Sequence, residues 1–214
     1  MVKKMIKLAY CNVDDLDLEK SYEFLPEHRK SKVDFYRFEK DKKLSAGAYL
    51  LLDTMLNEEN ITNPTFKTKE YGKAYISNHD NIHFNLSHSG RMVACAISDM
   101  EVGADIEYVD REIDLDIAKH YFFNSEYESI MRSSNPSNEF FRYWVLKESY
   151  MKYTGLGFNL KLDEFEILIG DEIKLKDDKN NLKFSLFDVE NYKLAACSKY
   201  DVKKAVEYNI KDLF

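Results

Sequence analysis

The chain has 214 residues, 44% of them hydrophobic and 32% charged, with a formal net charge of −7. This is enough apolar material for a substantial core, in one domain or in two small halves. No basic tract, zinc-finger spacing or basic heptad region is present, which disfavours nucleic-acid binding. No apolar run approaches the roughly 18 residues of a membrane span, and the start of the chain lacks the long apolar region of a secretory signal.

The three cysteines, Cys11, Cys95 and Cys197, are far apart, and each lies in or beside an apolar run. An odd, dispersed set argues against a disulfide framework or a thiolate metal site. We interpret them as small core residues of a protein in a reducing cytoplasm.

The first half of the chain shows strand patterns around two helices. One helix begins at Pro26, since proline suits a first helical turn. The second, at 39–57, carries an apolar stripe, with Lys40, Lys42 and Lys43 on its exposed side. Strands are predicted at 5–10, 65–69, 74–76, 82–88 and 92–97, the last two as a hairpin.

The second half begins with a predicted strand at 102–108. Its period of two places Asp105 and Glu107 on one face, while Ala104 and Ile106 lie on the other. Helices are predicted at 115–121, 125–131 and 138–154, and strands at 164–169, 172–176, 182–187 and 192–197.

A hairpin pattern recurs about a hundred residues apart. The matching segments are 84–86 with 93–96, and 184–186 with 194–197. In both, the second strand is rich in small residues. We therefore predict an α+β protein built from two similar α/β halves, residues 1–100 and 101–214, with the active site at their interface, where ligands tend to bind.

Carboxylates from the strand at 102–108 and from the long helix form a possible metal site. Asp105, Glu107 and Glu148 are the oxygen donors that Mg²⁺ binds together with waters and substrate phosphates. Taken alone, Asp105 and Glu107 also fit a solvated edge strand. Glu148 and Lys152, four residues apart, also fit an ordinary pair on a helix surface.

Phosphate binding would depend on side chains, because no phosphate-binding glycine loop of the P-loop or dinucleotide kind is present. The candidates are Lys43, Lys73, His88 and Lys152. Taken alone, His88 also fits a core or hairpin-end histidine, and Lys43 also fits a solvated helix face.

Four motifs follow one another along the chain. They are FNLSHS at 84–89, VGADIE at 102–107, Phe122-Phe123 with Glu126, and WVLKESYMK at 144–152. In this order they resemble the 4′-phosphopantetheinyl transferases, of the surfactin-synthetase-activating (Sfp) type rather than the short trimeric holo-acyl-carrier-protein synthases. The resemblance implies a monomer whose two halves are related by pseudo-two-fold symmetry, as in a dimer fused into one chain.

The resemblance also implies a ligand for each matching residue. Asp105, Glu107 and Glu148 match the Mg²⁺ carboxylates, and Lys152 matches a lysine near the pyrophosphate of coenzyme A, the co-substrate. His88 matches a histidine at the 3′-phosphate, with Ser87 beside it. Lys43 and Lys73 match basic residues around the nucleotide phosphates. His28, Arg29 and Lys32 stand loosely where the family has further basic residues.

The implied reaction transfers the phosphopantetheine arm of coenzyme A to a serine of an apo acyl- or peptidyl-carrier protein and releases 3′,5′-ADP. Lys152 would stabilise or protonate the leaving phosphate. The base for the serine hydroxyl is Glu148 as first choice and Glu126 as second, with a metal-bound water as a third route. We expect the acidic carrier to meet an apolar patch around Phe122 and Phe123.

Two other functions fit the same residues. The carboxylates could serve a metal-dependent phosphodiesterase acting on a nucleotide, although no rich His/Asp cluster is present. Alternatively, the chain could be a non-catalytic module that binds coenzyme A or a carrier. Transfer to a carrier protein would distinguish the first function from both alternatives.

Overall fold

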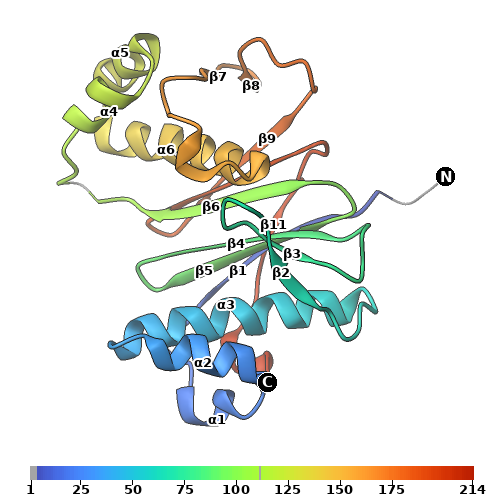
Figure 1. Ribbon diagram of the computed structural model, residues 1–214. Coiled ribbons are helices and arrows are strands. Elements are labelled where there is room, and N and C mark those ends of the chain that lie inside the picture. The colour runs from blue at the N-terminus through green and yellow to red at the C-terminus, as the bar shows by residue number, and fades with distance from the viewer. Residues whose placement is uncertain (1–3, 111) are drawn as a thin grey trace.

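Two β-sheets lie face to face between two long helices in the computed structural model, which describes residues 4–110 and 112–214 (Figure 1). Helix α3 (Glu39–Glu58) covers the outer face of one sheet, and helix α6 (Pro136–Thr154) covers the outer face of the other. Each helix packs on its sheet through an apolar core, and a third apolar cluster fills the space between the sheets. The result is a helix–sheet–sheet–helix stack, which confirms the predicted α+β class.

The helices and strands follow the predicted order. The other helices are α1 (Leu18–Tyr22), α2 (Glu27–Phe35), α4 (Asp116–Tyr121) and α5 (Asn124–Arg132), with 3₁₀ turns η1 (Gly157–Asn159) and η2 (Ile210–Asp212). The strands are β1 (Ile6–Asn12), β2 (Phe66–Thr68), β3 (Ala74–Ile76), β4 (His83–Ser89), β5 (Met92–Ser98), β6 (Val102–Tyr108), β7 (Ile167–Ile169), β8 (Ile173–Leu175), β9 (Lys183–Val189), β10 (Tyr192–Ser198) and β11 (Ala205–Glu207). Helix α1 and strand β11 were not predicted, because both are too short for a clear periodicity.

The two halves repeat one topology. In the first, β1 is followed by α3, the small hairpin β2–β3 and then β4–β5, and the sheet order is β1-β5-β4. In the second, β6 is followed by α6, the small hairpin β7–β8 and then β9–β10, and the order is β6-β10-β9. Strands β4 and β5 span 83–89 and 92–98, and β9 and β10 span 183–189 and 192–198, an offset of 100 residues. The sequence repeat therefore reflects a structural repeat.

The C-terminal residues depart from a simple division of the chain. Strand β11 pairs in parallel with β1 and extends the first sheet. Ile210 and Leu213 pack in the apolar core under α3. Residues 205–213 thus belong spatially to the first half, whereas the sequence reasoning assigned the whole of 101–214 to the second. The reason is that the edge of β1 has unpaired backbone groups, which β11 pairs with, and that Ile210 and Leu213 bury apolar surface of the core under α3.

The two sheets meet along the edge strands β4 and β6. The amide of Ala104 donates to Oδ1 of Asn85 at 2.9 Å, and the amide of Tyr108 donates to Oγ of Ser89 at 3.1 Å. These side chains of β4 take the place of a backbone ladder, so β4 and β6 lie side by side without forming one continuous sheet. The inter-sheet cluster of Leu8, Ala94 and Ile106, among others, holds this junction closed.

Helix α6 lies directly on β6, and one glycine makes this possible. A Cβ atom on Gly103 would overlap the carbonyl oxygen of Ser149 and the amide nitrogen of Tyr153. The helix is longer than predicted by two residues, since it begins at Pro136, with the Asn135 side chain accepting from the backbone of Asn138. This close packing brings the last turns of α6 over the carboxylates of β6.

Candidate active site

The ammonium of Lys152 and the hydroxyl of Ser87 meet on one buried carboxylate. Asp105 is 2% exposed, and its Oδ1 accepts from Lys152 Nζ at 2.7 Å and from Ser87 Oγ at 2.8 Å. Lys152 Nζ also lies 2.9 Å from Ser87 Oγ. Oδ2 of Asp105 is buried and has no hydrogen-bond partner among residues 4–110 and 112–214. A buried carboxylate oxygen without a partner is costly, so a cation at Oδ2 would satisfy it.

Glu107 and Glu148 lie close enough to Asp105 for its negative charge to shift their pKa values. Burial and the negative charge of Asp105 raise the pKa of Glu107 to about 7, although Ser89 Oγ donates to its Oε2 at 2.6 Å. Burial and the same charge raise the pKa of Glu148. Three carboxylates of like charge repel one another at a partly buried site, and a bound divalent cation would relieve that repulsion. Hard carboxylate oxygens are the donors that Mg²⁺ prefers, so these residues fit that ion.

The predicted convergence of the three carboxylates on one point is not met by the side-chain arrangement. Within residues 4–110 and 112–214, no group of three His, Cys, Asp or Glu side chains is placed to hold a metal ion. The physical reason is that Asp105 takes Lys152 as its counter-ion instead. The carboxylates are neighbours, but binding one cation would require them to rearrange.

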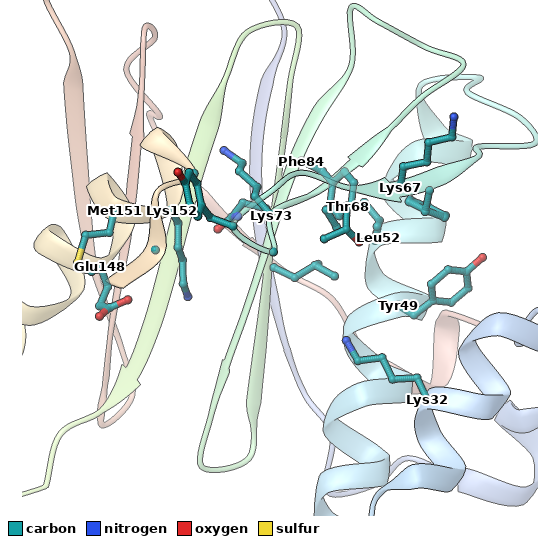
Figure 2. A pocket seen from close by; sticks show the side chains of 18 of the residues that line it. Lys32, Tyr49, Leu52, Lys67, Thr68, Lys73, Phe84, Glu148, Met151 and Lys152 are labelled. Atoms are coloured by element: carbon teal, nitrogen blue, oxygen red, sulfur yellow. The ribbon is translucent and has the colours of Figure 1, made fainter. Parts of the chain in front are cut away.

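A pocket of about 560 Å³ opens beside these residues, between the two halves (Figure 2). Glu148, Met151 and Lys152 of α6 form one wall, and α2, α3 and the β2–β3 hairpin form the other. The cationic and aromatic residues that line it are His28, Arg29, Lys32, Tyr49, Phe66, Lys67, Tyr71, Lys73, Phe84, Lys152 and Phe158. Cationic and aromatic walls together suit a ligand that carries both phosphates and an apolar part.

The loosely placed residues of α2 belong to this pocket. His28, Arg29 and Lys32 all line it, and His28 packs against Tyr49 of α3 and Phe66 of β2. Nη2 of Arg29 donates to the carbonyl of Ser45 at 2.7 Å, and its Nε is buried without a partner. Lys67 also lines the pocket and was missed. Its only sequence signal is a lysine in the short strand β2, which equally fits a solvated edge.

Lys73 lines the pocket, but the protein itself uses its ammonium group. Nζ donates to the carbonyls of Val102 at 3.0 Å and Tyr153 at 3.2 Å, and to Glu101 at 3.2 Å. The lysine thereby ties the turn after β2 to the start of β6 and to the C-terminal end of α6, where backbone carbonyls favour a cation. This placement gives Lys73 a structural task besides the predicted phosphate contact.

The other two predicted phosphate residues differ in placement. His88 is exposed on β4 and does not line the pocket. Partial desolvation and the positive charges of Lys152 and Lys32 lower its pKa, so these two lysines act on it electrostatically. Lys43 does not line the pocket. Its Nζ donates to the carbonyl of Asp14 at 3.1 Å and pairs with Glu39. The expectation that Lys43 contacts nucleotide phosphate is therefore not supported by the structure.

Glu126 was the second candidate for the base, and its surroundings correct that expectation. The side chain is 1% exposed and pairs with Lys147 at 2.8 Å. Its oxygens also accept from the amides of Ile167 at 2.7 Å and Phe123 at 3.0 Å. Glu126 does not line the pocket. A saturated carboxylate buried in the core cannot reach a substrate hydroxyl, so the group is structural.

The expected apolar docking patch also needs correction. Phe122 is 6% exposed and stacks on Phe140 with ring centroids 5.6 Å apart. It also packs against Trp144. Phe123 is half-buried beside the ammonium of Lys147. The ring of Phe122 belongs to the core of the second half, whereas Phe123 lies half-buried at its border, and Tyr121, which precedes them, is exposed.

The fold and site define a class of protein: two repeated α/β halves that enclose a pocket with acidic and lysine residues between them. Family models agree with this class. The 4′-phosphopantetheinyl transferase superfamily matches residues 101–197, and the N-terminal region of a 4′-phosphopantetheinyl transferase matches residues 14–100.

Full-length relatives give the particular family. The chain is 32% identical to 4′-phosphopantetheinyl transferase Sfp of Bacillus subtilis (strain 168) over 81% of each chain. It is 27% identical to the 4′-phosphopantetheinyl transferase psf-1 of Bacillus pumilus over 92% of this chain and 90% of the relative. With the enzyme gsp of Aneurinibacillus migulanus it shares 40% identity over 56% of this chain and 48% of the relative. The chain belongs to the 4′-phosphopantetheinyl transferase family, in its Sfp type.

Proposed function

We propose that this protein transfers the 4′-phosphopantetheine arm of coenzyme A to a serine of an apo acyl- or peptidyl-carrier protein and releases 3′,5′-ADP. The observation that carries this proposal is the buried Asp105, which lies near Glu107 and Glu148 and is bound to Lys152. Glu148 and Lys152 of this group line a cationic pocket between the halves. The pocket supplies cations for the phosphates of coenzyme A, and the carboxylates supply oxygen donors for Mg²⁺.

Mg²⁺ would be held by Asp105, Glu107 and Glu148, and when bound it offsets charge on the pyrophosphate. The unpartnered Oδ2 of Asp105 and the raised pKa of Glu107 support this assignment, because both show negative charge that the single ammonium of Lys152 does not offset. Lys152 is the residue that would have to exchange partners, leaving Asp105 for a phosphate oxygen. Lys152 lines the pocket, so its ammonium can turn towards a phosphate that binds there.

The chemistry of the chain's own residues follows from their positions. Glu148 lines the pocket, so its carboxylate is placed to accept the proton of a serine hydroxyl that enters there. Lys152 can donate a proton to the phosphate of 3′,5′-ADP as it leaves. His28, Arg29 and Lys32 would hold the nucleotide phosphates from the opposite wall, with His88 near the 3′-phosphate. These contacts orient the pyrophosphate for attack.

We further propose that the protein works as a monomer, with residues 1–100 and 101–214 forming the two halves apart from the C-terminal segment described above. Within residues 4–110 and 112–214, no helix has the length and apolarity needed to span a membrane. The three cysteines are buried and unpaired, in keeping with a reducing cytoplasm.

Mass spectrometry of a carrier protein tests the proposed function. The chain is incubated with coenzyme A, Mg²⁺ and an apo-carrier, using one fatty-acid carrier and one peptide-synthetase carrier. The carrier should gain the mass of one phosphopantetheine group, and only when Mg²⁺ is present. No mass gain with either carrier would reject the proposal. Release of 3′,5′-ADP without a carrier would instead favour a phosphodiesterase.

A further inference from the structure

Lys147, the neighbour of Glu148 in the chain, is a fully buried lysine that makes no contact with the pocket. It is 0% exposed and projects into the core of the second half, among the rings of Phe122, Phe123 and Phe165. Nothing in the proposed reaction uses this ammonium group. Burying a charge has a large desolvation cost, so its contacts need an explanation.

The ammonium of Lys147 is saturated by three oxygens. It lies 2.8 Å from Glu126 Oε2 and donates to the carbonyls of Leu162 at 2.8 Å and Phe165 at 2.7 Å. An ammonium has three donors, so none is left over. Two of the three oxygens belong to the backbone of the segment that follows α6.

That segment, residues 155–166, is here called the pocket loop. It begins at Gly155, which ends α6 in the left-handed conformation at φ 73°, and it leads into strand β7. Gly155, Gly157 and Phe158 line the pocket, and Phe158 is 87% exposed. The loop is therefore a wall of the site at this end, while Leu160, Leu162 and Phe165 further along pack against the apolar core of the second half.

Both ends of the pocket loop are held by lysines. At the near end, Lys73 donates to the carbonyl of Tyr153, and its side chain lies under Gly155. At the far end, Lys147 holds the carbonyls of Leu162 and Phe165. Its partner Glu126 accepts the amide of Ile167 at 2.7 Å, so the ion pair fixes the loop where it joins β7.

A buried ion pair is weak evidence for a contribution to stability, because apolar residues of similar size often replace such pairs without loss. An apolar residue at position 147 could not, however, donate to the carbonyls of Leu162 and Phe165. Those carbonyls would then lack partners, and the loop would move until water reached them. The specific contribution of the ammonium is the position of the loop backbone.

We infer that Lys147 is a positioning residue that holds the pocket loop in the conformation that binds coenzyme A, acting with Glu126 as its counter-ion. This inference rests on the proposed function for the identity of the ligand. The role of Lys147 in holding the backbone of the pocket loop does not depend on the proposed function. Lys147 is fully buried and does not line the pocket, whereas its neighbour Glu148 does.

The test compares Lys147→Met with the double variant Lys147→Met/Glu126→Gln, which leaves no unpaired buried charge if the single variant fails to fold. The control is Lys161→Met, an exposed lysine in the same loop. Coenzyme A affinity is measured by calorimetry, and loop mobility by hydrogen–deuterium exchange of residues 155–166 without ligand. In the double variant, we expect Kd and KM for coenzyme A to rise roughly tenfold while kcat stays within about threefold, together with faster loop exchange. The control should match the wild type.

Two outcomes would overturn the inference. One is a folded double variant whose coenzyme A affinity and loop exchange equal those of the wild type. The other is a fall in kcat with affinity unchanged, which would mean that Lys147 acts through α6 and not through the loop. If the wild type binds coenzyme A without transferring the arm, the proposed function fails while the binding test of the clamp still applies. If it does not bind coenzyme A, the hydrogen–deuterium exchange of residues 155–166 alone decides whether Lys147 holds the pocket loop.

Discussion

The ammonium of Lys152 lies 2.7 Å from Oδ1 of Asp105, in contact with the carboxylate that is proposed to hold Mg²⁺. An ammonium and a divalent cation cannot share this carboxylate without repelling each other. Lys152 therefore serves as the counter-ion of Asp105 in the absence of metal. The two proposed roles of Lys152, neutralising Asp105 and stabilising a phosphate, would be taken in turn.

Lys152→Met should tighten metal binding in the absence of coenzyme A, by roughly tenfold or more, because a competing positive charge is removed at contact distance. The same variant should lose transfer activity, since the leaving phosphate has no lysine. Binding of Mn²⁺, measured by calorimetry or paramagnetic resonance, checks the first effect independently of activity. Lys67→Met is the control, a lysine of the same pocket without a recorded carboxylate contact. Metal binding in Lys152→Met that is weaker than or equal to that of the wild type would contradict the proposal that Lys152 and the metal compete for Asp105.

Asp105→Asn tests the metal assignment with little change of shape. The amide can still accept from Ser87, but it cannot give a cation its negative charge. Transfer should fall by about a thousandfold or more, with the melting temperature within about 3 °C of the wild type. Carrier mass gain and thermal unfolding are measured on the same preparation. A stable variant with wild-type activity would refute the role of Asp105.

The fold was predictable from the sequence because each half repeats a clear pattern. The strand at 102–108 alternates between faces, and α6 shows helical spacing and ends at Gly155. The repeat of hairpins across 100 residues revealed the two halves. Strand β11 was not predictable in the same way, since three residues carry no period and their pairing partner β1 lies almost two hundred residues earlier.

The site was predictable in part, and the errors have a common cause. Residues on one strand or one helix, such as Asp105 and Glu107, or Glu148 and Lys152, keep their relative direction whatever the tertiary structure. Glu126 and Phe122 were misjudged because motif position does not reveal burial. Both lie on segments that pack against α6, where Lys147 and Trp144 cover them. Lys73 lines the pocket, but its three protein partners come from distant segments, which a sequence pattern does not reveal.

Gly103 is predicted to be the residue that sets the distance between α6 and β6. Gly103→Ala would place a methyl group against the backbone of Ser149 and Tyr153, which cannot move aside as a flexible side chain can. We expect a loss of about 3 kcal/mol or more in unfolding free energy, and a large loss of transfer activity because Glu148 and Lys152 move with the helix. Denaturant unfolding measures the first effect. Gly170→Ala is the control, since nothing lies within 4 Å of a Cβ at that position. Equal stability of the two variants would contradict this packing argument.

Glu101 anchors an ion cluster that should make stability depend on acid. Burial acts to raise its pKa, but hydrogen bonds from His83 and Lys69 and the charge of Lys73 outweigh burial, so the pKa lies well below its ordinary value of 4.5. A depressed carboxyl pKa stabilises the fold above the unfolded value, and this contribution is lost as the pH falls below it.

Glu101→Gln should therefore lower the unfolding free energy at pH 7 by about 1–3 kcal/mol, the usual range for a lost charged hydrogen bond. The difference from the wild type should shrink as the pH is lowered from about 5 to about 3, because the unfolded wild-type chain then takes up a proton at Glu101 whereas the folded protein, with its depressed pKa, does not. Urea unfolding across this pH range measures both effects. Glu23→Gln, an exposed carboxylate on the first half, should stay close to the wild type throughout. A Glu101→Gln deficit that is constant with pH would show that the lost interaction does not depend on the carboxylate charge.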